Sequence, residues 1–118
     1  MSKLNFKPVS PDNSQWEQLV STATDTTLPE IVVGVVAKYL NNTDTYISVF
    51  EALHSAGWSH RRSVKIQWID AEKITAKNVA SKLANVQGVV IPGGFGERGV
   101  EGKIIAAQHA LKLSLIHI

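Results

Sequence analysis

Residues 88–105 read GVVIPGGFGERGVEGKII. An apolar segment of strand length, residues 88–91, runs into five glycines within ten residues, and a pattern typical of a helix follows. Folding alone does not explain this density, because each glycine loses more backbone entropy on ordering than any other residue. Glycines between a strand and a helix allow backbone N–H groups to approach a ligand or a developing negative charge. We therefore take this loop as the candidate site.

Two further strand–helix units precede the loop. Residues 31–36 are continuously apolar and of strand length, as expected for a parallel strand buried on both faces. A second strand is predicted from Val64, Ile66, Trp68 and Ile69. Apolar residues at helical spacing follow each strand: Tyr46, Val49, Phe50 and Leu53, then Val79, Leu83 and Val86. Gly57 is placed to close the first of these helices, and Thr75 to cap the second.

The alternation of strands and helices predicts an α/β fold. Its connections are too short for a sandwich, and right-handed crossovers would give a parallel sheet with helices on both faces. A third helix is expected over residues 100–111, with Ile104 and Ala107 on one face. Three strands are few for such a sheet, which would leave one edge open. We predict a doubly wound parallel sheet truncated to about three strand–helix units, as in the first part of a larger domain.

Residues 1–29 differ from the rest, because they are polar and hold three of the four prolines. One short helix is expected over residues 14–22, since Ser14 and Glu17 have the spacing of a capping box. Three apolar residues would share a face of this helix: Trp16, Leu19 and Val20. The surrounding composition is that of a linker.

Composition limits the possible functions. The chain has 118 residues, enough for one modest domain, and its formal charge of +2 is too small to imply a nucleic-acid surface. No apolar run approaches the roughly 20 residues that span a bilayer, and residues 1–8 lack the apolar stretch of a signal peptide. The absence of cysteine excludes disulfides and thiolate zinc sites and fits a cytoplasmic location. We expect no nucleic-acid or membrane partner.

Three interpretations of the glycine loop remain open on the residues alone. Gly94, Gly96 and Gly99 match the G-x-G-x-x-G dinucleotide pattern, although that pattern normally follows the first strand of its unit. Alternatively, residues 92–96 could aim one or two N–H groups at a carbonyl oxygen, on which charge develops during acyl transfer. In the third interpretation, the glycines only allow close packing of strand and helix.

Several segments resemble the glutamine amidotransferase domain of the CTP synthase family. The glycine loop does so over residues 93–103 (GGFGERGVEGK), the first strand–helix unit over residues 37–53, and the second strand over residues 64–70. Residues 14–20 resemble the segment that joins the family's synthetase domain to this domain. The similarity covers about residues 10–110, and its motifs occur in the family's order.

The resemblance implies a class I amidotransferase domain with a flavodoxin-like sheet. In this family a cysteine nucleophile, with a histidine and a glutamate later in the chain, hydrolyses glutamine. The ammonia passes to the synthetase domain, which uses ATP and Mg²⁺ to aminate UTP to CTP, and GTP activates the hydrolysis. The implied partners are glutamine, the synthetase domain and the remainder of the amidotransferase domain, in a family that forms homotetramers.

Some family positions can be placed on this chain. Gly94 matches the glycine that meets substrate glutamine and contributes to the oxyanion hole, and Gly93 and Phe95 match its neighbours. Arg98 and Glu101 match motif positions beside that site. Coupling to the activating nucleotide is the hypothesis for them, with a solvated turn residue as the alternative for Arg98.

No catalytic residue, metal ligand or cofactor is assigned within these 118 residues. The family's nucleophile lies in a Gly-x-Cys-x-Gly elbow, which by spacing would fall just beyond Ile118. The four histidines stand in no family catalytic motif, and no pair has metal-ligand spacing. Ala37 replaces a glycine that usually precedes Lys38.

The resemblance divides the chain into three parts. Residues 1–29 are expected to be an interdomain linker with a short helix, residues 30–110 a partial amidotransferase domain, and residues 111–118 a tail unrelated to the family. The resulting hypothesis is a fragment of CTP synthase that is inactive alone. The alternatives are a small dinucleotide-binding module and a non-catalytic fragment that pairs with a partner through its open sheet edge.

Overall fold

Strands and helices alternate along the chain, as the sequence predicts. The structure, a computed structural model, describes residues 5, 7–42, 44–94 and 96–113. Its elements in order are α1 (Ser14–Ala23), β1 (Glu30–Ala37), α2 (Ile47–Ser59), β2 (Ser63–Asp70), the 3₁₀ turn η2 (Ala71–Lys73), α3 (Val79–Lys82), β3 (Gly88–Val90) and α4 (Val100–Lys112). The α/β class is therefore confirmed.

The three strands form one parallel sheet in the order β2-β1-β3. Val35, in the central strand, lies beside Trp68 of β2 and Val90 of β3. The chain first steps from β1 to β2 and then crosses back to the other side of β1. This reversal is the start of the flavodoxin-like strand order, which confirms the predicted doubly wound topology.

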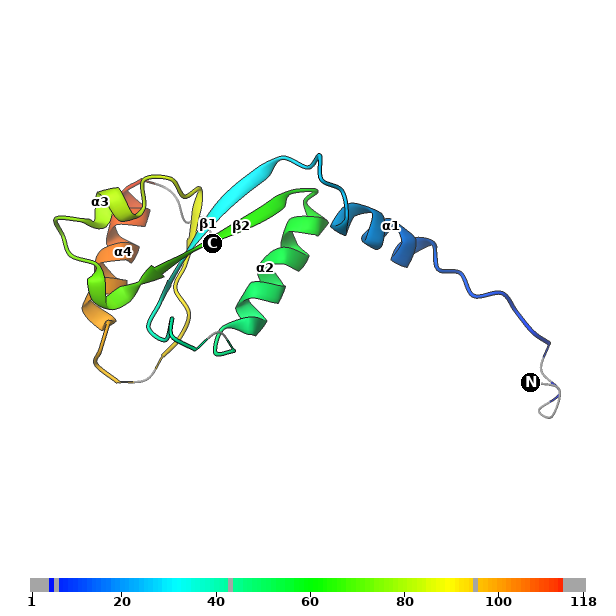
Figure 1. Ribbon diagram of the computed structural model, residues 1–118, viewed down its shortest axis with the longest axis horizontal. Helices are drawn as coiled ribbons and strands as arrows, with labels where there is room; N and C mark the ends of the chain where they lie inside the picture. The colour runs from blue at the N-terminus through cyan, green and yellow to red at the C-terminus, as the bar shows by residue number, and fades with distance from the viewer. Residues whose placement is uncertain (1–4, 6, 43, 95, 114–118) are drawn as a thin grey trace.

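Helices cover both faces of the sheet, with α2 on one face and α3 and α4 on the other (Figure 1). Successive side chains of a strand point to opposite faces. Val36 accordingly packs into the cluster with α3 and α4, while its neighbour Val35 packs with Tyr46 on the α2 face. Both valines have no exposed surface, which explains why the central strand is continuously apolar rather than alternating.

Helix α4 has the expected length but not the expected buried face. Its buried residues are Gly102, Ala106 and Ala110, whereas Ile104 is 51% exposed. The helix approaches η2 so closely that a Cβ atom on Gly102 would lie 1.8 Å from the carbonyl oxygen of Ala71. Small residues therefore line the contact, and the prediction of an apolar face through Ile104 and Ala107 is wrong.

Gly57 does not close α2, contrary to the sequence prediction. The helix continues to Ser59, and the left-handed residue near its end is Arg61, with φ of 52°. A Cβ atom on Gly57 would lie 2.6 Å from Cγ2 of Val64 and 2.8 Å from the carbonyl oxygen of Arg62. This glycine is therefore required by the close approach of α2 to the chain that enters β2.

Two other helix starts also differ from expectation. Asn13, not Ser14, is the N-cap of α1, and the carboxylate of Asp12 accepts a hydrogen bond from the Ser14 N–H at 3.0 Å. The predicted capping box is therefore not formed. Thr75 caps a turn, since its hydroxyl accepts from the Asn78 N–H at 3.3 Å, but the helix that follows ends at Lys82.

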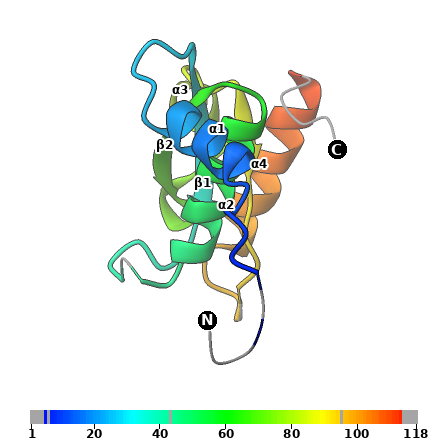
Figure 2. The ribbon, with the colours of Figure 1, turned by 90° about the vertical axis from the view of Figure 1, so that its right-hand side faces the viewer.

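Helix α1 lies at one end of the molecule, beside the end of α2 and away from the sheet (Figure 1). Figure 2 looks at the molecule from that end, with α1 in front of the strands. No residue of α1 is buried, and Trp16 is 68% exposed. Of the predicted tail, residues 114–118 lie outside the described residues, and α4 extends into residues 111–112.

Candidate functional site

The candidate site lies at the edge of the sheet where all three strands end. The loop that begins with Lys38 follows β1, η2 follows β2, and the glycine loop (residues 93–99) follows β3. In doubly wound sheets, ligands bind outside the carboxyl ends of the strands, at the point where the strand order reverses. That point lies between β1 and β3, so the fold places the glycine loop where such a sheet binds a ligand.

Glycine is required for two different reasons at positions of the loop and of the adjoining α4. Gly96 and Gly99 adopt left-handed φ values of 83° and 77°, which other residues adopt only with strain. Gly99 also packs on η2, since a Cβ there would lie 3.2 Å from Cβ of Ala71. Backbone geometry and close packing therefore explain Gly96, Gly99 and the helical Gly102.

Neither reason applies to Gly93 or Gly94. Among the described residues, a Cβ on Gly93 would have no atom within 4 Å, and one on Gly94 would meet only Nζ of Lys103, at 3.2 Å. Neither residue has a left-handed φ. Neither packing nor backbone conformation therefore requires glycine at these two exposed positions. Glycine is expected there if a ligand approaches the backbone closely. Phe95, the third predicted binding residue, lies outside the described residues.

Two lysines lie against the loop. Nζ of Lys103 donates a hydrogen bond to the carbonyl oxygen of Pro92 at 2.9 Å, which ties the first turn of α4 to the end of β3. Nζ of Lys38 lies 3.2 Å from the position that a Cβ on Gly96 would occupy. Lys38 also lies over the ring of Tyr39, 5.2 Å from its centroid. The loops after β1 and β3 therefore meet at Lys38.

Arg98 forms an ion pair that the sequence analysis did not predict. Its Nε donates a hydrogen bond to Oε1 of Glu72, in η2, at 2.5 Å. This hydrogen bond holds the pKa of the Glu72 carboxyl below its usual range, and the charges of Arg98 and Lys38 act in the same direction. Glu101, the other residue assigned to effector coupling, is exposed in the first turn of α4.

Tyr46 fixes the start of the loop after β1. The residue precedes α2 and is only 6% exposed, so it packs in the core as the helical spacing indicates. Its hydroxyl also accepts hydrogen bonds from the backbone N–H groups of Lys38, at 3.2 Å, and Tyr39, at 3.3 Å. The side chain thereby satisfies two backbone donors that the strand no longer pairs.

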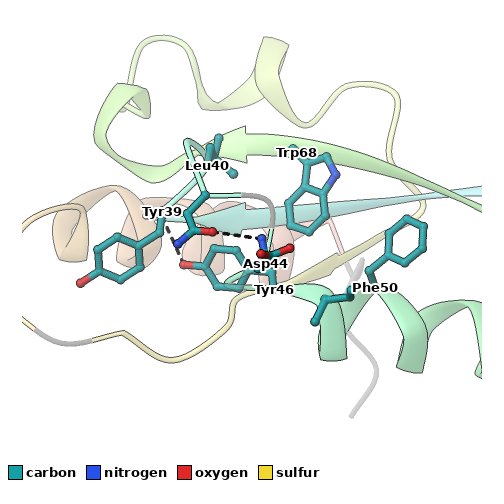
Figure 3. A pocket seen from close by; sticks show the side chains of 8 residues that line it. Tyr39, Leu40, Asp44, Tyr46, Phe50 and Trp68 are labelled. Carbon is teal, nitrogen blue, oxygen red and sulfur yellow. Dashed lines mark hydrogen bonds between the residues drawn. The ribbon is translucent and has the colours of Figure 1, made fainter.

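A pocket of about 450 Å³ opens beside this loop, on the α2 face of the sheet (Figure 3). Its walls are mainly aromatic, formed by Tyr39, Tyr46, Phe50 and Trp68, with Asn42 and Asp44 as polar residues. The rings of Tyr46 and Trp68 are 6.0 Å apart between centroids. Its volume lies in the range of small-molecule sites. The sequence did not reveal this pocket, because its aromatic residues come from separate elements.

Over the described residues, no three histidine, aspartate or glutamate side chains come together in a group that could hold a metal ion. Over the same residues, no helix is both long enough and apolar enough to cross a bilayer.

A doubly wound α/β sheet with a glycine loop at the reversal of its strand order defines the class of the protein. The glutamine amidotransferase class-I family matches residues 42–116, and the chain belongs to this family.

Within that class, the most similar relatives found are CTP synthases. The chain is 44% identical to the CTP synthase of Carboxydothermus hydrogenoformans over 110 residues, which cover 93% of this chain and 20% of that protein. It is 43% identical to the CTP synthase of Bacillus subtilis over 97 residues, which cover 82% of this chain and 18% of that protein. The chain thus spans about a fifth of the length of these relatives.

A solved structure agrees with this relationship. The glutaminase domain of Trypanosoma brucei CTPS, determined with bound acivicin, superimposes with a TM-score of 0.63 and 34% sequence identity. The match covers 70% of this chain and 33% of that one. The chain is therefore homologous to part of the glutaminase domain of CTP synthase, which confirms the resemblance drawn from its motifs.

Proposed function

We propose that this chain is part of a CTP synthase, which makes CTP from UTP in an ATP-dependent reaction with ammonia from glutamine. In this proposal residues 1–29 form an interdomain linker and residues 30–110 the start of the glutaminase domain. Identity of 44% to a CTP synthase supports it. Mg²⁺, activation by GTP, a tetrameric assembly and a cytoplasmic location belong to the same proposal for the whole protein.

The role we propose for this chain's own residues is to bind the side-chain amide of glutamine. The observation that carries it is the bare backbone at Gly93 and Gly94, where packing does not require glycine. Without a Cβ, the carbonyl oxygen of the amide approaches the backbone closely. An N–H group directed at this oxygen stabilises the negative charge that develops when a nucleophile attacks the carbonyl carbon.

We also propose that these 118 residues do not hydrolyse glutamine by themselves. The chain contains no cysteine, the residue that attacks the amide in this family. Members of a catalytic triad act as a unit, so the loss of one removes several orders of magnitude in rate. The test is ammonia release by the purified chain with L-glutamine and GTP. We expect none above the buffer background, and release well above it would refute this part of the proposal.

Binding is tested by NMR titration of the ¹⁵N-labelled chain with L-glutamine. We expect the amide signals of Gly94 and Gly96 to shift, and Gly94→Ala to weaken the response. This variant should fold, because within the described part of the chain the added methyl group meets only the flexible end of Lys103. D-glutamine is the matched control ligand and should shift these signals less.

The same titration separates the alternative functions. Shifts at the glycine loop with NAD⁺, and none with L-glutamine, would support a dinucleotide-binding module. Association that rises with protein concentration in ultracentrifugation, without either ligand, would support a fragment that pairs through an open strand edge. Either result would replace the proposed function.

A further inference from the structure

We infer that Glu72 is a positioning residue, whose carboxylate holds Arg98 and thereby keeps the glycine loop in its binding conformation. The consequence for glutamine rests on the proposed function, whereas the consequence for the loop's conformation does not. Glu72 lies in η2, at the end of β2, and Arg98 lies 26 residues further on, in the loop that follows β3.

Glu72 itself stands on a well-fixed turn. Its backbone N–H donates a hydrogen bond to Oδ1 of Asp70 at 3.0 Å, which caps η2. The preceding Ala71 is 1% exposed, and α4 packs directly on its backbone at Gly102. The carboxylate is therefore presented from a part of the fold that cannot shift without disturbing the packing of α4.

The loop, by contrast, contains the residues most able to change conformation. Arg98 lies between Gly96 and Gly99, both at left-handed φ. Glycine occupies other backbone conformations about as readily, so these two positions do not by themselves select the observed geometry. The Arg98 side chain lies between these two glycines in the sequence and is anchored to Glu72. Its anchoring restricts the backbone conformations available to both glycines. Gly99 already lies near the anchor, since a Cβ on it would be 3.7 Å from Cγ of Glu72.

The carboxylate also faces a second cation. Lys38, in the loop after β1, acts on Glu72 in the same direction as Arg98, and its Nζ lies beside Gly96. Cations from the loops after β1 and β3 therefore both favour the charged form of Glu72. An exposed ion pair contributes little to global stability, but a loop orders in a local equilibrium that a small contribution can shift.

The test compares Glu72→Gln with the unchanged 118-residue chain at pH 7. NMR measures the exchange with water of the Val100 and Lys103 amide protons, which are hydrogen-bonded to carbonyl oxygens of the loop, those of Glu97 at 3.3 Å and Gly99 at 3.1 Å. Loss of the pair should accelerate exchange about two- to fivefold, the factor that corresponds to a typical exposed ion pair. The urea midpoint of unfolding should fall only slightly, because an exposed ion pair contributes little to global stability. Sodium chloride at about 1 M should accelerate exchange in the unchanged chain but not in the variant, because it screens the pair.

Lys73→Gln is the matched control. Lys73 lies in the same turn, but its ammonium group pairs with Asp70, at 3.8 Å, instead of with the loop. This variant should leave the exchange of the Val100 and Lys103 amide protons unchanged. Equal exchange in Glu72→Gln and the unchanged chain, or an equal increase in Lys73→Gln, would overturn the inference.

Titration of both proteins with L-glutamine separates this inference from the proposed function. If the unchanged chain does not bind glutamine but Glu72→Gln still accelerates loop exchange, the proposed function fails and the positioning role stands. If both proteins bind glutamine equally and exchange equally, the positioning role fails and the proposed function stands. If both ideas hold, Glu72→Gln should weaken glutamine binding by about the factor by which it accelerates exchange.

Discussion

Gly102 lies in the first turn of α4, where the helix packs against the backbone of η2. Replacement by alanine would place Cβ 1.8 Å from the carbonyl oxygen and 2.9 Å from the carbonyl carbon of Ala71. Backbone atoms cannot move aside as a flexible side chain can, so the helix must shift. We expect Gly102→Ala to lower the free energy of unfolding by about 3 kcal/mol, as severe overpacking does. Urea unfolding followed by circular dichroism measures this loss.

Gly93→Ala is the control for this prediction. The same methyl group would there meet no atom of the described residues within 4 Å, and the backbone is not left-handed. Its free energy of unfolding should stay within about 0.5 kcal/mol of the unchanged chain, as for other surface changes. Equal losses in the two variants would show that α4 does not approach η2 as closely as the structure indicates.

The ion pair of Glu72 makes a prediction about pH. The hydrogen bond from Arg98, with the charges of Arg98 and Lys38, lowers the pKa of this carboxyl in the folded chain from an ordinary value of 4.5. A group whose pKa is lowered by folding stabilises the fold above its ordinary pKa, and this contribution is lost as the pH falls through the lowered value. Glu72→Gln should therefore unfold at slightly lower urea concentration than the unchanged chain at pH 7.

At a pH below the lowered pKa, the urea midpoints of the two proteins should coincide. The difference between them is the quantity to measure, because Asp12 and Asp25 also have a lowered pKa, from hydrogen bonds donated within their own turns. Both proteins share those two carboxyls, so their effect cancels. A difference that persists unchanged in acid would show that the carboxylate charge is not its cause.

Among the individual residues of the site, the sequence identified the glycines and Arg98 but not the partner of Arg98. Glu72 and Arg98 meet because parallel strands end at one edge of a sheet, which brings η2 beside the glycine loop. Local patterns carry no information about such a pair. The available signal was an acidic residue three positions after the second predicted strand, and it becomes informative only once the strand order is known.

Among the elements, the three strands and the last helix were the most predictable. The expected strands and the helix over residues 100–111 agree with β1, β2, β3 and α4 to within one or two residues. The errors fall where tertiary packing overrides a local preference. Gly57 was taken for a helix end because glycine favours that position, yet in the structure it serves the contact between α2 and Val64. Contacts across elements cannot be seen in a helical pattern.

Helix α2 gives a direct test of that explanation. Gly57→Ala should raise the intrinsic helix propensity but force Cβ to within 2.6 Å of Cγ2 of Val64. We expect packing to dominate, with a loss of about 1–3 kcal/mol in the free energy of unfolding. Ser55→Ala, at an exposed position of the same helix, should be neutral or slightly stabilising. A gain in stability from Gly57→Ala would mean that Gly57 is merely a poor helix former.

The whole molecule is elongated because its N-terminal part extends away from the sheet (Figure 1). It measures 69 × 33 × 24 Å, and its radius of gyration of 19.7 Å exceeds the value of about 13 Å for a compact chain of this length. Helix α1 buries none of its residues, and Trp16 and Val20 remain largely exposed. The cooperative unit is therefore the sheet with the helices that cover it.

Removal of residues 1–24 tests this division of the molecule. The shortened chain keeps the hydrogen bond from the Ser63 N–H to the carbonyl oxygen of Pro29, at 2.9 Å, which joins the start of β2 to the chain before β1. Its melting temperature should stay within about 3 °C of the full chain, since only exposed contacts are lost. Val35→Ala, at a fully buried position of the central strand, should by contrast lower the melting temperature by about 10 °C. A loss on shortening as large as that of Val35→Ala would mean that α1 belongs to the cooperative unit, and that residues 1–29 are more than a linker.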